Sequence, residues 1–264
     1  MVRSALTLLF GILFYGTCFA QFSPPGLGNT NTAAWFALGM KQKLSSNKKI
    51  ESATFIGIGT ISNPNNYNLF QKPSIYVLNE EITHHFKPNW KYSIATSYRW
   101  QNKYNSSPPY ALEEPNARQE IRFYSRFTYS KSFRKIKYSL GYRPEIRFFY
   151  NPDFTTPTEK LEFRSRLRGK IDVNLNNEKT KKISTSAEIL LATSKTTQWN
   201  TFQYKESRFC LYYSVTIPKQ KITFNMGYMN NVLGKKLNKG VHYLAFDVVF
   251  KNPFQKKSKL QTPI

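Results

Sequence analysis

Alternation of apolar and polar residues runs through most of this chain and constrains its fold more than any other feature. Because successive side chains of a strand point to opposite faces, alternation predicts strands with one apolar and one polar face. It is clearest over residues 90–101, 136–148 and 161–172. In the first stretch, apolar residues from Trp90 to Trp100 share one face, and mostly small or charged residues share the other. No segment beyond the N-terminal apolar run shows a helical period, so we predict an all-β fold.

The length of the alternating segments favours a membrane-spanning barrel. Many contain 12 or more residues, whereas strands of globular proteins usually contain about 5–6 residues. A tilted strand needs roughly 9–11 residues to cross a bilayer. Short turns and longer loops also alternate along most of the chain, as in outer-membrane barrels. The eleven segments are 33–44, 48–60, 73–86, 90–103, 117–131, 136–149, 158–173, 181–194, 200–217, 220–233 and 240–251. Since bacterial single-chain barrels have even strand numbers, we predict a single antiparallel transmembrane β-barrel of twelve strands, with ten as the second choice.

A soluble β-sandwich or calyx is the competing fold, because its strands alternate as well. In that fold the apolar face points inward. Two details favour the membrane version: the polar faces are crowded with Arg and Glu, and Trp90 and Trp100 lie near opposite ends of one segment. Tryptophans in such positions are typical of the aromatic girdles at the two membrane interfaces.

Residues 1–20 have the pattern of a secretory signal peptide. Arg3 precedes an apolar run from Ala5 to Tyr15, and the small residues Cys18 and Ala20 fit a cleavage site. An anchor helix and lipidation of Cys18 are the alternatives. Together with the alternation, export predicts a location in the bacterial outer membrane. The predicted organisation is a signal peptide at 1–20, an N-terminal segment at 21–32, a barrel at 33–252 and a basic tail at 253–264.

The chain is strongly basic, with 39 Lys and Arg against 15 Asp and Glu and a formal charge of +24. Such a balance usually suggests a nucleic-acid partner, but export argues against one. The lysine surplus falls at turns and tails, for example at 179–182 and 256–259. Near an anionic membrane surface each such lysine would contribute about 1 kcal/mol; ordinary solvation of exposed turns is the alternative.

The polar strand faces carry nine arginines and eight carboxylates, which is close to charge balance. If the apolar faces contact lipid, these side chains point into the lumen. Small barrels fill their interior with side chains, and guanidinium groups pair well with carboxylates, so we predict ion pairs that pack the lumen. The alternative is a positive constriction or anion site centred on Arg164, Arg166 and Arg168. The predicted lumen residues are Arg99, Arg122, Arg126, Arg143, Arg147, Arg164, Arg166, Arg168, Arg208, Glu51, Glu81, Glu120, Glu145, Glu162, Glu188, Glu206 and Asp247.

Few residues suggest catalysis. The histidines are His84, His85 and His242, and none belongs to a zinc-binding motif. The sequence also contains no nucleotide-binding motif. We therefore predict no metal, no cofactor and no catalytic residue. A lipid hydrolase needs a histidine beside a nucleophile, and no spacing pairs a particular serine with His85 or His242. Cys210 is expected to point inward. We therefore predict a structural or weakly pore-forming protein; the alternatives are an outer-membrane lipid hydrolase and a soluble periplasmic β-calyx carrier.

Several short motifs follow one another in an informative order. They are Trp35, Glu80-Glu81, Tyr98-Arg99, residues 118–126, Tyr142-Arg143, residues 163–168, Glu188, Ser207-Arg208-Phe209 and Tyr212-Tyr213. In this order they resemble the domain-of-unknown-function 2490 family, predicted outer-membrane barrels common in Bacteroidetes. The resemblance covers residues 33–252. It implies a barrel surrounded by outer-membrane lipid and lipopolysaccharide and assembled by the barrel-assembly machinery, without an established activity. A Lys-rich tail of 14 residues follows Phe250, whereas such barrels commonly end on an aromatic residue.

Overall fold

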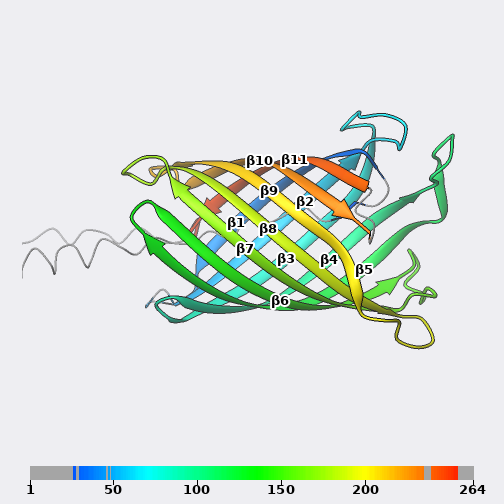
Figure 1. The fold of residues 1–264 in the computed structure, drawn as a ribbon, viewed down its shortest axis with the longest axis horizontal. Helices are drawn as coiled ribbons and strands as arrows, with labels where there is room; N and C mark the ends of the chain where they lie inside the picture. The colour runs from blue at the N-terminus through cyan, green and yellow to red at the C-terminus, as the bar shows by residue number, and fades with distance from the viewer. Residues whose placement is uncertain (1–25, 28–29, 46, 48, 235–238, 255–264) are drawn as a thin grey trace, which may run out of the picture.

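The computed structural model describes residues 26–27, 30–45, 47, 49–234 and 239–254. Over these residues the chain forms a closed β-barrel of long, tilted strands (Figure 1), which confirms the predicted all-β barrel. The strands are β1 (Thr32–Lys43), β2 (Ile50–Ile61), β3 (Lys72–Lys87), β4 (Trp90–Tyr104), β5 (Leu112–Phe133), β6 (Ile136–Tyr150), β7 (Leu161–Asn174), β8 (Lys181–Lys195), β9 (Gln203–Ile217), β10 (Ile222–Leu233) and β11 (Lys239–Lys251). Among the described residues, no helix has the length and apolar character needed to cross a membrane.

The barrel closes with eleven strands in the described part of the chain, so the predictions of twelve and of ten strands are wrong. In an up-and-down barrel with an odd number of strands, the first and last strands run in the same direction. β1 and β11 accordingly pair in parallel over ten residue pairs, from Thr32–His242 to Lys41–Lys251. The prediction failed because it applied an even-number rule, which assumes that the closing pair is antiparallel.

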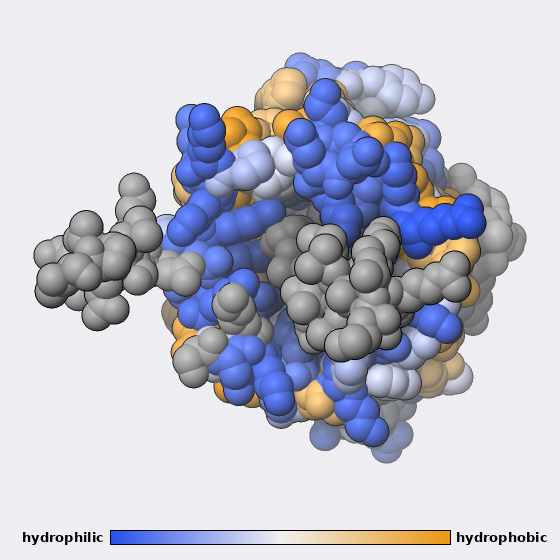
Figure 2. Space-filling view, turned by 90° about the vertical axis from the view of Figure 1, so that its left-hand side faces the viewer, coloured by the Kyte–Doolittle hydropathy of each residue, from blue (hydrophilic) through white to orange (hydrophobic). Residues whose placement is uncertain are grey.

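The two faces of the strands point as the alternation predicts. On β4, Ile94 is 60% exposed on the outer surface, whereas its inward neighbour Ser93 is buried. On β7, Leu167 faces out and Arg166 is buried. Figure 2 looks onto the end that carries the short turns and shows hydrophilic residues gathered there, with apolar residues toward the sides. The outer surface is thus largely apolar, and the charged strand faces line the lumen.

One part of the lumen is apolar, which the alternation does not predict. The inward faces of β1–β3 and β9–β11 form a buried cluster in which Trp35, Phe55 and Tyr243 are at most 4% exposed. Cys210 points inward and belongs to this cluster, which confirms its predicted orientation. On β1 both faces are apolar, since Phe36 and Leu38 lie outside and Trp35 inside. The lumen therefore has an apolar wall facing a charged wall on β4–β8.

The segments at the two ends of the sequence are described only in part. The predicted signal peptide at 1–20 and most of the predicted tail at 253–264 lie outside the described residues. Within the predicted N-terminal segment, Leu27 is 2% exposed, and its backbone N–H donates to the Tyr243 hydroxyl at 3.0 Å. Leu27 therefore packs inside the barrel rather than on its surface.

Glycine at position 57 leaves the space that the Trp35 ring occupies. A Cβ at Gly57 would lie 2.3 Å from the Cζ2 atom of Trp35. We expect Gly57→Ala to lower the free energy of unfolding by about 1–3 kcal/mol, because overpacking displaces a buried ring. Gly169→Ala is the matched control, since a Cβ there has no neighbour within 4 Å. Urea unfolding of the two variants in detergent tests this; equal losses of stability would contradict it.

Candidate functional site

Six arginines and four glutamates form a continuous network on the inner face of β4–β8. The arginine side chains are 1–17% exposed and the glutamate side chains 0–11%. We call this set the lumen network. Its members are Arg99, Glu120, Arg122, Arg143, Glu145, Arg147, Glu162, Arg164, Arg166 and Glu188.

Glu145 on β6 is the most heavily shared carboxylate of the network. Its carboxylate oxygens lie 2.7 Å from Arg143, 3.2 Å from both Arg122 and Arg166, and 3.8 Å from Arg164. The Glu145 side chain is 0% exposed. One buried carboxylate therefore contacts four guanidinium groups from three neighbouring strands.

Glu120 on β5 has a similar role toward the loop-bearing end of the barrel. Its carboxylate lies 2.5 Å from Arg122 Nη2 and 3.8 Å from Arg99 Nε, and it also accepts from Arg147. Arg147 also forms an ion pair with Glu162 at 2.5 Å, and Glu162 accepts a hydrogen bond from Arg164. These contacts link β4, β5, β6 and β7 in one chain of ion pairs.

The strand register explains why these residues meet. Glu145 lies directly opposite Arg164, and Arg147 directly opposite Glu162, in the β6–β7 pair. Side chains opposite each other on one face have Cβ atoms roughly 4.5–5.5 Å apart, which is within reach of a guanidinium–carboxylate contact. Alternation fixes the face, and the register then decides which charges pair.

The other predicted lumen residues lie around the network or apart from it. Glu81 accepts from Ser93 at 2.6 Å and lies 3.5 Å from Arg126. Arg208 contacts Glu206 at 2.5 Å. Asp247 is buried on β11, opposite Ala37 and Asn225, within the apolar part of the barrel. Glu51 lies 3.7 Å from His85.

Some lumen residues are absent from the predicted set. Arg118 contacts Glu159 at 3.3 Å, and Asp172 contacts Lys170 at 2.9 Å and Lys182 at 3.4 Å. Tyr124 donates from its hydroxyl to Glu81 at 3.1 Å. Alternation places Asp172 and Lys170 on the polar face of their strand, so the sequence pattern alone could have identified both as lumen residues.

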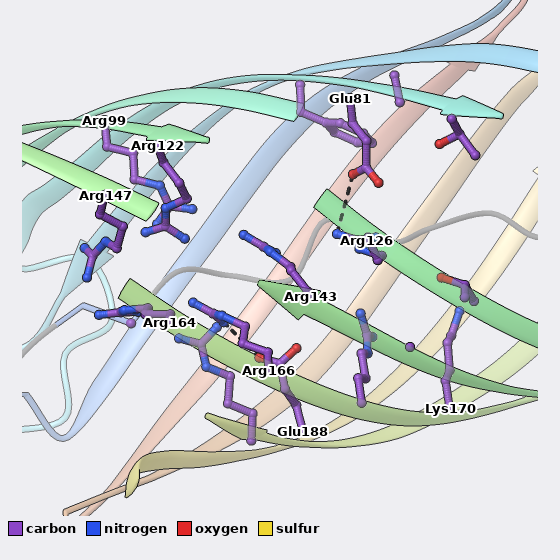
Figure 3. Close-up of a pocket in the computed structure, with 18 of the residues that line it drawn as sticks. Glu81, Arg99, Arg122, Arg126, Arg143, Arg147, Arg164, Arg166, Lys170 and Glu188 are labelled. Atoms are coloured by element: carbon purple, nitrogen blue, oxygen red, sulfur yellow. Dashed lines mark hydrogen bonds and ion pairs between the residues drawn. The ribbon is translucent and has the colours of Figure 1, made fainter. Parts of the chain in front are cut away.

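A cavity of about 320 Å³ adjoins the lumen network. Thirteen of its lining residues are Lys or Arg, and four are Glu. Figure 3 shows the labelled arginines projecting from the strands toward this space, with Glu81 paired to Arg126 and Glu188 to Arg166. Glu120, Glu145 and Glu162 do not line it, so positively charged side chains outnumber carboxylates in the cavity wall.

The histidines do not contact a serine hydroxyl in any hydrogen bond of the described structure. His242 lies on the outer face, with Nδ1 2.6 Å from the Tyr228 hydroxyl and 3.3 Å from the Asn230 amide. His84 stacks edge-on against Tyr92. Among the residues that the structure describes, no group of three or more His, Cys, Asp or Glu could hold a metal ion.

Fold and site together define a closed β-barrel with an apolar outer surface and an ion-paired lumen. The sequence matches the family model described as protein of unknown function (DUF2490) over residues 32–239, and the chain belongs to that family. This match confirms the family resemblance. None of the curated proteins compared with the sequence matches it.

Proposed function

We propose that this protein is an integral β-barrel of the bacterial outer membrane, structural or weakly conducting, without enzymatic activity. One observation carries the proposal: every strand presents large apolar side chains on the outer surface. Soluble monomers rarely expose contiguous apolar patches larger than a few hundred Å² or so, whereas a bilayer requires an outward apolar band. One exposed example from each strand, β1 to β11, is Leu38, Ile56, Leu78, Ile94, Phe127, Leu140, Leu167, Ile189, Leu211, Met226 and Leu244.

Strand length and composition support the same location. The strands contain 12–22 residues, and roughly 9–11 suffice to cross a bilayer. On β11, Leu244, Phe246 and Phe250 point outward in alternation, which suits the last strand of a barrel presented to the barrel-assembly machinery. The outer face would then contact lipid and lipopolysaccharide, and the short turns would face the periplasm.

The filled lumen favours weak conduction. Ion-paired side chains of the lumen network cover the charged wall of the lumen, and Trp35 and Tyr243 are buried in the apolar cluster on the other wall. The cavity that adjoins the lumen network has a volume of about 320 Å³. We therefore expect the barrel to pass ions slowly compared with a general porin.

Gel mobility and bilayer conductance test the proposal. The protein without its predicted signal peptide should require detergent for solubility, migrate faster on gels before heating than after heating, and give only small conductance steps in liposomes. A chain that stays monomeric and soluble in buffer without detergent would contradict the membrane location. Large, porin-like conductance would contradict the filled lumen.

A further inference from the structure

The lumen network contains more positive than negative charge. Its six arginines outnumber its four glutamates, which leaves a formal excess of two positive charges among side chains that are at most 17% exposed. Arginine stays protonated in proteins, so this charge cannot be removed by titration. Uncompensated charge in such surroundings is costly, and a counter-ion is needed nearby.

Two further arginines extend the excess toward the cavity. Arg168 on β7 lies next to the network, opposite Glu188 on β8, and donates to the Ser186 hydroxyl at 3.0 Å, while the ion pair of Glu188 is with Arg166. Arg126 lies 3.5 Å from Glu81, which also accepts from Ser93 and Tyr124. Both arginines line the cavity, where donors not used by carboxylates are available to a ligand.

The residues that line the cavity carry more positive than negative charge. Glu120, Glu145 and Glu162 do not line the cavity, whereas the arginines that contact them do. Figure 3 shows the labelled arginines projecting toward this space. With thirteen Lys or Arg and four Glu around it, the cavity has a formal lining charge of 13 − 4 = +9. Its volume of about 320 Å³ falls within the range of small-molecule sites.

We propose that this cavity binds a multivalent oxyanion, either a phosphate or a small polycarboxylate. Guanidinium groups offer paired N–H donors that match two oxygens of a phosphate or carboxylate. A multivalent anion would contact arginines from several strands at once and neutralise the buried excess. This proposal goes beyond the membrane location and does not depend on it, because the cavity lies within the barrel itself.

Calorimetric titration of the detergent-purified protein tests the site with three probes: pyrophosphate, citrate and chloride. At an ionic strength of about 0.15 M, where exposed charges are largely screened, we expect saturable binding of pyrophosphate or citrate. Which of the two binds more tightly distinguishes a phosphate ligand from a carboxylate ligand. If folded protein binds neither, or binds them no better than chloride, the proposal is wrong.

Two variants locate the binding and leave every carboxylate of the lumen network with at least one arginine partner. Arg168→Gln removes the hydrogen bond to Ser186 and leaves Glu188 with Arg166, and Arg164→Gln leaves Glu162 with Arg147 and Glu145 with its three other arginines. Each should weaken oxyanion binding about tenfold, the effect of losing a charged hydrogen bond. The control Lys219→Gln removes the same charge at an exposed turn and should bind as the unaltered chain does.

Folding of each variant is checked by its heat-dependent gel mobility. Unchanged affinity in both folded lumen variants would overturn the proposal, and so would equal weakening in Lys219→Gln, because the effect would then come from net charge rather than from the cavity.

Discussion

Replacing Glu145 by Gln is expected to lower the free energy of unfolding by about 3–5 kcal/mol, the usual cost of leaving a buried charge without its partner. Glu145 is fully buried and contacts Arg122, Arg143, Arg164 and Arg166. The amide keeps the shape of the carboxylate but removes its charge, so the four guanidinium groups would repel one another. Urea unfolding of the protein in lipid or detergent measures the effect.

Glu159→Gln is the matched control for this prediction. Glu159 also pairs with an arginine, Arg118 at 3.3 Å, but about a third of each side chain is exposed. Exposed pairs contribute roughly 0–1 kcal/mol, so this variant should unfold almost as the unaltered chain does. If the two substitutions had equal effects, the lumen network would not stabilise the barrel through buried charge.

Leu167→Arg should destabilise the barrel by about 2–4 kcal/mol in a bilayer, because an arginine on the lipid face must enter hydrocarbon near the midplane. Leu167 lies near the middle of β7 and is 51% exposed on the outer surface. In a soluble barrel the same change would alter stability by only about 0.5 kcal/mol, as surface substitutions usually do. Unfolding titrations in liposomes therefore distinguish the two surroundings.

Leu175→Arg provides the control for position along the strand. Leu175 has a similar exposure, 46%, but lies just beyond the end of β7 in a turn. Near the interface the cost of arginine falls to about 0–1 kcal/mol. Similar small effects at Leu167 and Leu175 would contradict an outer surface covered by lipid.

The outward and inward faces of most strands could be predicted from the sequence, because period two is a local property. The pairing of Glu145 with four arginines could not, since those residues come from β5, β6 and β7. Their contacts depend on the register between strands, and alternation does not specify it. A balanced count of charges therefore concealed a local excess of arginine.

The apolar part of the lumen and the strand number were missed for related reasons. Trp35 is flanked by apolar residues on both faces of β1, so alternation is weak there, and the space for its ring comes from Gly57 on the next strand. The closing pair of β1 and β11 joins the two ends of the barrel in parallel. Neither feature has a local signal, because each depends on strands coming together in the closed barrel.

Fractionation of cells that express the full chain tests the central claim most directly. The account predicts that the protein sediments with the outer membrane and stays there after alkaline carbonate extraction, because its outer surface is in contact with lipid. Release of the folded protein with the periplasmic extract would contradict the account, since an apolar band on eleven strands would then have no lipid to cover it.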